Sequence, residues 1–511
     1  MEKLKINVID GIMGSGKSSG MINKINYLKN KHPDNKFLII VPYLDEVERY
    51  SASLRGFKAL VKSIPPKKIT LEKYLKENKD IICTHQLFLQ NSELIVNYAS
   101  GYTLVIDEAI NSLISVFDFP KLINSERINT DIKIQSDNTL TLKENASIYS
   151  FGDDDLTFLF NKGYLKLSSD TSNLIIWDDT KPLASIYSCL RDYFIQNDVY
   201  RLTAKHELEE DTYYYISLFP VKTFRVFKDI FIMTYLWDAQ MMKYYFDFYG
   251  SEYHFLYPVP AFPISGSSES LNNINSSNYN LEENFIDFEN KDFFILDNKK
   301  FYKNFEFTQR IQACKNIYLP GYTYNIQRNI YAKNPNSKNT LYFFWNKNRK
   351  VQNTITLSYS FYQNIENNKQ VLSMLKNNVN KFTKDNLPAS FKHNNKRVIW
   401  SVFDCAKDSF SNSRGHFSST NYIPINSKAT NQYKDANVLI YLVNRFINPH
   451  YYNFIKNYCP SGENFDEDLY ALSELLQWIW RSAIRDNKPV CIYIPSERML
   501  NLLLNWLNNA I

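Results

Sequence analysis

Apolar residues in the first 110 positions fall into short runs, separated by longer stretches in which apolar and polar residues recur with a helical period. The runs are rich in β-branched residues and cover Leu4–Ile9, Phe37–Val41, Ile81–Thr84 and Thr103–Ile106. The stretches between them, such as Lys17–Lys31 and Leu71–Lys79, are amphipathic and rich in lysine. Short, almost wholly apolar runs are typical of strands that are buried on both faces. Their alternation with helices predicts an α/β fold with a parallel sheet covered on both sides.

This regular pattern is interrupted between Phe117 and Val226, where apolar and polar runs mix without a clean period. Within this segment, IKIQSDNTLTL predicts a β-hairpin. A strand signal returns at Asp229–Thr234, followed by an amphipathic helix near Ala239–Phe248 and a strand near Tyr253–Val259. We therefore interpret residues 1–264 as a first domain that carries an insertion at about 117–226.

A Ser/Asn-rich stretch, SGSSESLNNINSSNYN, has almost no apolar periodicity and predicts a linker over residues 265–285. Residues 286–511 are interpreted as a second α/β domain. Its expected strands lie near Asp292–Leu296, Leu341–Trp345, Arg397–Phe403 and Val490–Ile494. Its expected helices lie at Asn364–Val379, Ala436–Asn448, Leu469–Ile484 and Ser496–Leu507.

Composition narrows the class of protein but not its function. A chain of 511 residues with 44% hydrophobic and 22% charged residues is expected to be folded and to contain more than one domain. The net charge of +6 is compatible with a nucleic-acid partner and equally with a slightly basic enzyme. The six cysteines are scattered without a C-x-x-C pair, so we expect neither a zinc site nor disulfides. No apolar stretch approaches the roughly 18 residues of a membrane span, and we expect a cytoplasmic protein without membrane contact.

The most specific chemical signal is G-I-M-G-S-G-K-S at positions 11–18, placed between a predicted strand and a predicted helix. This is a P-loop, whose backbone N–H groups surround phosphates at a helix N-terminus. Three of the chain's 13 glycines fall within six positions here, which makes a chance match a poor explanation. Lys17 is expected to reach the β- and γ-phosphates, and Ser18 to bind Mg²⁺. The other expected nucleotide contacts are Gly11, Gly14, Ser15 and Gly16.

Two acidic residues, Asp107 and Glu108, end the strand-like run Thr103–Ile106. Such a position lies at the carboxyl edge of a parallel sheet, where α/β proteins bind their ligands. We expect Asp107 to join the Mg²⁺ shell and Glu108 to polarise the attacking water. An acidic pair at a helix start is also a common structural feature, but here the P-loop is already present. ATP and Mg²⁺ are the predicted cofactors.

Further motifs resemble those of superfamily 2 helicases. Val41-Pro42-Tyr43 and the following residues resemble motif Ia, Ile82-Cys-Thr84-His85-Gln resembles an element that precedes motif II, and Asp107-Glu108-Ala109 resembles a DEAD/DEAH-type motif II. The resemblance implies two RecA-like P-loop domains and contact of the first two motifs with nucleic acid. It also implies a motif III that couples hydrolysis to movement, for which Thr234 and Thr203 are candidates. We favour Thr234 because it ends a predicted strand.

The resemblance extends to the C-terminal part of the chain. Lys428-Ala-Thr430-Asn431 lies where motif V would be, so Thr430 and Asn431 become candidate nucleic-acid contacts. Gln477-Trp-Ile-Trp480-Arg481-Ser-Ala-Ile-Arg485 resembles motif VI, with Trp480 in place of glycine and one extra residue before the last arginine. A spacing of four residues predicts that Gln477, Arg481 and Arg485 share one helix face. The family pattern implies that Arg485 is the arginine finger and that Arg481 contacts the phosphates or Glu108.

Together these motifs are most similar to helicase-like proteins encoded by bacteriophages and prophages of Gram-positive bacteria. The resemblance implies an ATP-dependent helicase or translocase that serves phage DNA replication or recombination, with DNA and phage replication proteins as partners, in the host cytoplasm. Two alternatives stay open. One is a terminase-like packaging ATPase, and the other is an ATP-gated replication-initiation factor that does not unwind strands.

Overall fold

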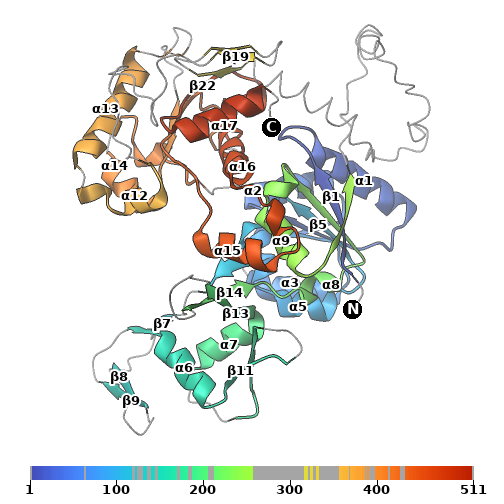
Figure 1. Ribbon diagram of the computed structural model, residues 1–511. Coiled ribbons are helices and arrows are strands. Elements are labelled where there is room, and N and C mark those ends of the chain that lie inside the picture. Colours follow the sequence, from blue (N-terminus) through green and yellow to red (C-terminus); the bar gives the residue numbers. More distant parts are fainter. Residues whose placement is uncertain are drawn as a thin grey trace.

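The computed structural model describes residues 3–62, 65–117, 121–123, 131–134, 140–143, 148–169, 173–181, 187–204, 212–256, 316–319, 323–325, 330–332, 356–367, 369–385, 387, 391, 397–412, 415–425 and 432–508. Figure 1 shows two α/β regions side by side and a smaller mixed region below the first. The described helices include none that is both long and apolar enough to cross a bilayer.

The first region is built on a seven-stranded parallel sheet with the strand order β16-β1-β15-β5-β2-β4-β3. The expected strands are present with small shifts at their ends. Their bounds are β1 Lys5–Asp10, β2 Phe37–Val41, β3 Lys58–Ala59, β4 Ile81–Thr84, β5 Thr103–Asp107, β15 Asp229–Thr234 and β16 Glu252–Leu256. The helices are α1 Lys17–Lys31, α2 Leu44–Ser53, α3 Lys67–Lys76, α4 His85–Leu89, α5 Ser92–Tyr98, α8 Lys222–Arg225 and α9 Met241–Phe248.

Burial on both faces explains the nearly continuous apolar runs of this sheet. In β2, Ile39 packs with residues of α1 and α2 such as Ile25 and Val47, whereas Ile40 faces the opposite side. On that side the core contains Leu71 of α3 and further residues of α5, α8 and α9. Successive strand residues point to opposite faces of the sheet. A strand that is buried on both faces therefore needs an apolar residue at nearly every position.

The segment between β5 and β15 leaves the main sheet and forms a second, antiparallel sheet with the order β11-β12-β13-β14-β6. Its strands are β6 Ile114–Val116, β11 Leu165–Leu167, β12 Leu174–Trp177, β13 Asp198–Ala204 and β14 Thr212–Leu218. Helices α6 Asp153–Asn161 and α7 Ser188–Gln196 pack on one face. The expected hairpin is present as β8 Asp131–Ile134 paired with β9 Leu140–Lys143, and β7 Lys121–Ile123 pairs with β10 Ile148–Ser150.

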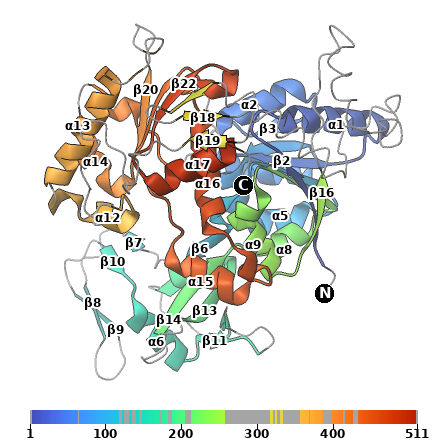
Figure 2. The same cartoon turned by 45° about the horizontal axis from the view of Figure 1, so that its top comes forward.

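The second region contains a four-stranded parallel sheet with the order β17-β22-β21-β20. The strands are β17 Ile317–Tyr318, β20 Val398–Ser401, β21 Val438–Tyr441 and β22 Val490–Tyr493, and a separate hairpin joins β18 Thr323–Asn325 to β19 Ile330–Ala332. The helices are α12 Tyr359–Gln363, α13 Lys369–Asp385, α14 Lys407–Phe410, α15 Pro449–Tyr458, α16 Glu467–Ile479 and α17 Glu497–Leu507. Figure 2 shows α16 and α17 between this sheet and the first region.

Two expectations for the second region were wrong. The segment Ala436–Asn448, expected to be a helix, contains the central strand β21. All four residues of β21 are buried, and a wholly apolar run of this kind fits a buried strand as well as a helix. The helix expected over Leu469–Ile484 ends at Ile479. The expected linker and the strands near Asp292–Leu296 and Leu341–Trp345 lie outside the described residues.

Helix α15 joins the two regions, because it belongs to the second in sequence and packs on the first. Phe454 and Ile455 are fully buried in the same core cluster as β13, β14 and α9. The hydroxyl of Tyr458 accepts a hydrogen bond from the Thr203 N–H of β13 at 3.4 Å. A further contact between the regions is made by α17, where Trp506 Nε1 donates to the Tyr235 hydroxyl at 2.9 Å. The regions therefore share apolar core at two separate places.

Candidate nucleotide site

The loop at positions 11–18 connects β1 to α1 at the carboxyl edge of the main sheet. Gly14 and Gly16 have φ angles of +81° and +85°, in the left-handed region that strains residues with a Cβ. No heavy atom lies within 4 Å of the place where a Cβ would stand on either glycine, so the loop is open on that side. Among the described residues, no side chain caps the N-terminus of α1. Its first N–H groups are therefore available to an anion such as a phosphate.

Lys17 is the first residue of α1 and lies over its own loop. Its Nζ donates to the carbonyl oxygens of Gly11 and, at 3.1 Å, Ile12. The loop is in turn held by β15, because the Gly11 N–H donates to the Thr234 carbonyl at 2.9 Å. Ser15, between the two glycines, is buried. The residues of this motif that are expected to bind nucleotide thus lie together in the loop and the first turn of α1.

Asp107 ends β5 directly beside this loop and accepts hydrogen bonds on both carboxylate oxygens. Ser18 Oγ donates to Oδ1 at 3.1 Å, and the Tyr50 hydroxyl donates to Oδ2 at 2.8 Å. Arg49 Nη2 lies 3.5 Å from Oδ2. Tyr50 is completely buried, and burial together with the Asp107 charge raises its pKa well above the usual value. A protonated Tyr50 is therefore a fixed hydrogen-bond donor to Asp107.

Ser18 and Asp107 are the side chains that could hold a divalent cation here. They are hydrogen-bonded to each other and belong to two different elements, α1 and β5. Mg²⁺ is commonly bound by one or two protein oxygens together with water and phosphate oxygens, so a larger cluster of protein ligands is not required. In the part of the chain that the structure describes, no group of three or more His, Cys, Asp or Glu residues is gathered as a metal site.

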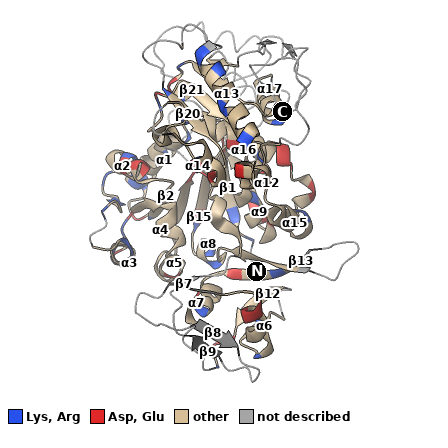
Figure 3. Ribbon diagram, turned by 90° about the vertical axis from the view of Figure 1, so that its left-hand side faces the viewer, with Lys and Arg blue, Asp and Glu red and all other residues tan. Residues whose placement is uncertain are grey.

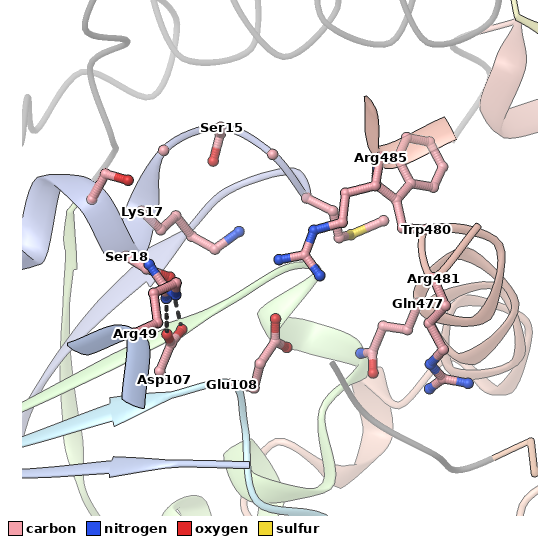
Figure 4. Close-up of a pocket in the computed structure, with 14 residues that line it drawn as sticks. Ser15, Lys17, Ser18, Arg49, Asp107, Glu108, Gln477, Trp480, Arg481 and Arg485 are labelled. Carbon is pink, nitrogen blue, oxygen red and sulfur yellow. Dashed lines mark hydrogen bonds and ion pairs between the residues drawn. The ribbon is translucent and has the colours of Figure 1, made fainter. Parts of the chain in front are cut away.

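Glu108 follows Asp107 with a φ of +69°, an unusual value for a residue other than glycine. Its N–H donates to the Met233 carbonyl of β15 at 3.0 Å, which anchors the backbone at the point where β5 ends. Figure 4 shows the Glu108 carboxylate in the cavity, below Lys17 and apart from Asp107. The two acidic residues therefore face different parts of the site, as two different roles would require.

The second region closes this site. A cavity of about 280 Å³ is lined by loop residues, Arg49, Asp107 and Glu108 from the first region and by Gln477, Trp480, Arg481 and Arg485 from the second. In Figure 4 the guanidinium of Arg485 extends toward Lys17 and Glu108, and the amide of Gln477 is directed toward Glu108. The guanidinium of Arg481 points away from Lys17.

The expectation that Gln477, Arg481 and Arg485 share one helix face was wrong. Helix α16 ends at Ile479, and Arg485 lies on a separate 3₁₀ helix, Ala483–Asp486. Between them Ser482 is extended, and the Ala483 N–H donates to the Ala436 carbonyl at 2.9 Å instead of to the preceding helical turn. This break, and not helical spacing, directs Arg485 into the cavity.

Arg481 is almost fully buried, with 3% of its surface exposed. Its Nη1 approaches the Pro424 carbonyl at 3.4 Å, while its Nε has no hydrogen-bond partner among the described residues. Burial lowers the pKa of Arg481 to about 10, although the carboxylate of Glu474, the Tyr43 hydroxyl and the carboxylate of Glu108 oppose this effect. The structure therefore places a buried and incompletely paired cation at the edge of the cavity.

The two candidates for the coupling element lie in different sheets. Thr234 ends β15 between the strands of the P-loop and of Asp107, is completely buried, and holds the loop through its carbonyl. Its hydroxyl has no hydrogen-bond partner among the described residues. Thr203 lies on β13 of the antiparallel sheet, against α15. Only Thr234 is next to the nucleotide site.

The residues expected to contact nucleic acid differ in how far they are buried and in what they contact. Pro42 and Tyr43 follow β2 and are half-buried, at the same sheet edge as Thr84, which ends the neighbouring strand β4. The Thr84 hydroxyl accepts a hydrogen bond from the Leu87 N–H at 3.3 Å and so caps α4. His85 is buried at the start of that helix. Thr430 and Asn431 lie outside the described residues.

Several residues of the site and of the contact between the regions were not expected from the motifs. Arg49 and Tyr50 of α2 contact Asp107, and no motif in the sequence marks them. Gln240 Nε2 donates to the Ser473 hydroxyl at 2.9 Å, which links the segment after β15 to α16. Asn111 Nδ2 approaches Glu474 Oε1 at 3.4 Å. The last two pairs join residues more than 200 positions apart, and no local pattern reveals them.

Comparison with known proteins gives a fold for part of the chain and one similar protein over its whole length. Residues 326–507 match a family described as the YonV C-terminal Rossmann-like domain. Over 522 residues, the chain is 29% identical to the SPbeta prophage-derived uncharacterized protein YonV of Bacillus subtilis (strain 168), and the match covers 100% of both chains. No solved structure matches the chain. A mixed α/β protein with parallel sheets, a Rossmann-like C-terminal part and similarity to a prophage protein is thus established.

Proposed function

We propose that the chain is an ATP hydrolase that uses Mg²⁺ and belongs to the helicase or translocase type of superfamily 2. One observation carries the proposal. The P-loop, the acidic pair Asp107 and Glu108, and Arg485 of the second region all face a single cavity of about 280 Å³. Phosphoryl transfer needs phosphate binding, a metal-binding carboxylate, a group that orients water, and positive charge near the γ-phosphate. The residues of this cavity can supply all four.

Each side chain has a role that its position supports. Lys17 and the first N–H groups of α1 would bind the phosphates, and Ser18 with Asp107 would hold the metal ion, which neutralises phosphate charge when bound. Glu108 would orient the attacking water. Arg485 would stabilise charge that develops on the transferred phosphoryl group, because its guanidinium extends toward Lys17 from the opposite wall.

The helicase type is favoured by the way the site is connected to the second region. We interpret the two parallel sheets as two RecA-like domains, with the cavity between them. The segment after β15 starts at Thr234, beside the P-loop, and ends at Gln240, which binds Ser473 of α16. A change at the nucleotide can therefore reach the second domain through one short segment. Such a connection is what coupling of hydrolysis to movement requires.

Nucleic acid, and DNA in the first instance, is the partner that we propose, with phage replication proteins as further partners in the host cytoplasm. Pro42, Tyr43 and Thr84 continue the carboxyl edge of the sheet outward from the nucleotide site, on strands β2 and β4. Figure 3 shows lysine and arginine residues on many elements, with several on α13. The lysine and arginine residues of the described chain do not form one continuous path for a nucleic-acid strand. We therefore propose the contact from the motifs that contain Pro42, Tyr43 and Thr84.

The proposal is tested by the rate of ATP hydrolysis by the full chain with single-stranded DNA, duplex DNA or RNA at two salt concentrations. We expect stimulation by nucleic acid that falls as salt is raised, because backbone contacts release counterions. Arg485→Ala is expected to lower kcat by about 10³-fold with ATP affinity retained, which is the effect of losing an arginine finger. A loss of kcat below tenfold would remove Arg485 from the mechanism. No hydrolysis under any condition would refute the enzyme assignment.

A second candidate is an ATP-gated binding module that does not move along DNA. The packing of α15 favours it, because Phe454 and Ile455 are fully buried in a core shared with the first region. A translocase must move its two domains relative to each other in each cycle, and an apolar contact of this kind resists separation. Strand displacement measured beside ATP hydrolysis distinguishes the two candidates. Nucleic-acid-stimulated hydrolysis with strand displacement supports the motor, whereas hydrolysis without displacement supports the gated module.

A further inference from the structure

Arg49 lies in the nucleotide cavity although it belongs to neither the P-loop nor the acidic motif. It is on α2, where its Nε donates to Glu46 Oε2 at 2.6 Å. Its Nη2 lies 3.5 Å from Asp107 Oδ2 on β5. Figure 4 shows Arg49 beside Ser18 and Asp107, on the side of the cavity away from Arg485. One cation therefore spans two carboxylates, one on its own helix and one in the proposed metal site.

This position gives Asp107 a counter-charge in the absence of a metal ion. Asp107 is 6% exposed, and a buried carboxylate is costly unless it is paired and hydrogen-bonded. The hydroxyls of Ser18 and Tyr50 supply hydrogen bonds but no charge. The guanidinium of Arg49 supplies the full positive charge beside Oδ2. Two hydrogen bonds and the nearby Arg49 guanidinium therefore hold the Asp107 side chain in place.

The two contacts of Arg49 differ in strength. A separation of 2.6 Å between Nε and the Glu46 oxygen is that of a short, charge-assisted hydrogen bond, whereas 3.5 Å to Asp107 is longer than a hydrogen bond. The side chain is 37% exposed and packs over the Tyr50 ring, with 4.8 Å from its guanidinium carbon to the ring centroid. Arg49 can withdraw from Asp107 while it keeps its ion pair with Glu46.

We propose that Arg49 is a positioning residue that competes with the divalent cation for Asp107 and thereby sets the affinity of the site for metal. This inference rests on the proposed nucleotide site. A guanidinium and a divalent cation repel each other, and one carboxylate cannot neutralise both. Removal of Arg49 is therefore expected to increase metal affinity. Removal of the Glu46 charge leaves Asp107 as the remaining carboxylate partner of Arg49 and is expected to decrease metal affinity.

The experiment measures Mn²⁺ binding to the full chain by electron paramagnetic resonance, with ADP held at saturation. Binding of ADP alone is measured by calorimetry in EDTA. The half-saturating Mn²⁺ concentration is expected to fall about tenfold in Arg49→Gln and to rise at least threefold in Glu46→Gln. Arg55→Gln, an exposed arginine just beyond the same helix, is the matched control and should match the wild type. ADP affinity in EDTA should be the same in all four proteins.

Three results would overturn the inference. An unchanged or higher half-saturating Mn²⁺ concentration in Arg49→Gln would show that Arg49 does not oppose the metal. A loss of ADP affinity in EDTA would show instead that Arg49 binds the phosphates directly. The half-saturating Mn²⁺ concentration must change in opposite directions in Arg49→Gln and Glu46→Gln. A loss of Mn²⁺ affinity in both variants would indicate a damaged fold. If the wild type binds ADP in EDTA but no Mn²⁺, only the metal role fails; if it binds no ADP, the proposed nucleotide site fails first.

Discussion

Replacement of Arg481 by methionine tests two things separately: whether its buried charge destabilises the folded protein, and whether the residue takes part in catalysis. The guanidinium is buried, its Nε has no hydrogen-bond partner among the described residues, and burial lowers its pKa to about 10. One pKa unit corresponds to about 1.4 kcal/mol, so the charge costs the folded protein about 3 kcal/mol relative to the unfolded chain. Because the folded-state pKa is depressed, the unfolded chain binds the proton more tightly. The penalty is therefore complete below about pH 10 and decreases as the pH rises above it.

Methionine is close to arginine in length and carries no charge. The variant loses the long contact to the Pro424 carbonyl, which is worth about 1 kcal/mol at most. Glu474 loses the attraction of Arg481 but keeps Arg445, whose Nη2 lies 3.7 Å from Glu474 Oε2. The expected net effect is a gain of about 1–2 kcal/mol in the free energy of unfolding, because the cost of the buried, incompletely paired charge exceeds the contacts that are lost.

Urea denaturation at pH 7 measures this gain, with Arg55→Met as an exposed control that should stay within about 0.5 kcal/mol of the wild type. The gain should shrink when the same comparison is made above pH 10, provided that both proteins remain folded. A loss of more than about 1 kcal/mol in Arg481→Met would refute the reasoning, since it would mean that the charge is fully compensated. If kcat falls about 10²-fold or more with ATP affinity retained, Arg481 is the arginine finger and the roles of Arg481 and Arg485 are reversed.

Three further outcomes follow from the site and from the junction between the regions. Glu108→Gln is expected to bind ATP and to hydrolyse it at least 10²-fold more slowly, whereas Lys17→Ala is expected to weaken nucleotide binding itself; hydrolysis by Glu108→Gln at the wild-type rate would mean that another group orients the water. Gly462→Ala is expected to lower the free energy of unfolding by about 2 kcal/mol or more, because its Cβ would overlap the Ile455 carbonyl of α15. Equal urea midpoints for Gly462→Ala and the wild type would contradict the close packing at the end of α15.

The first region could be predicted well because its elements and its chemistry are local in sequence. In the P-loop, the strand, the glycines, the lysine and the helix follow one another within about 30 residues, so the pattern fixes their relative positions. The acidic pair could be placed because parallel strands bring their carboxyl ends to one sheet edge. Thr234 ends a strand of recognisable pattern and lies at the same edge, while its role in coupling stays a prediction.

The second region was harder to predict because buried residues hide the period on which the prediction depends. The run Val438–Tyr441 is buried on every side, so neither a helical nor a strand period is visible in it. The end of α16 at Ile479 depends on a hydrogen bond from Ala483 to Ala436, which is distant in sequence. The contacts of Arg49 and of Gln240 likewise arise only after folding brings separate helices together.

The position of Gln477 connects these observations. Its Nε2 approaches the Ser473 hydroxyl at 3.4 Å, and the same hydroxyl accepts the 2.9 Å hydrogen bond from Gln240. Gln240 follows Thr234, whose carbonyl holds the P-loop, while Gln477 lines the cavity opposite Glu108. Ser473 is thus shared by a segment that begins at the phosphate-binding loop and by a residue that closes the cavity. Because one hydroxyl serves both, movement of the segment after β15 and movement of Gln477 cannot be independent. In the proposed function, a change at the nucleotide would reach the second region through the backbone contact at Thr234 and the side-chain contact at Ser473, and the threonine hydroxyl itself would not be needed for the connection.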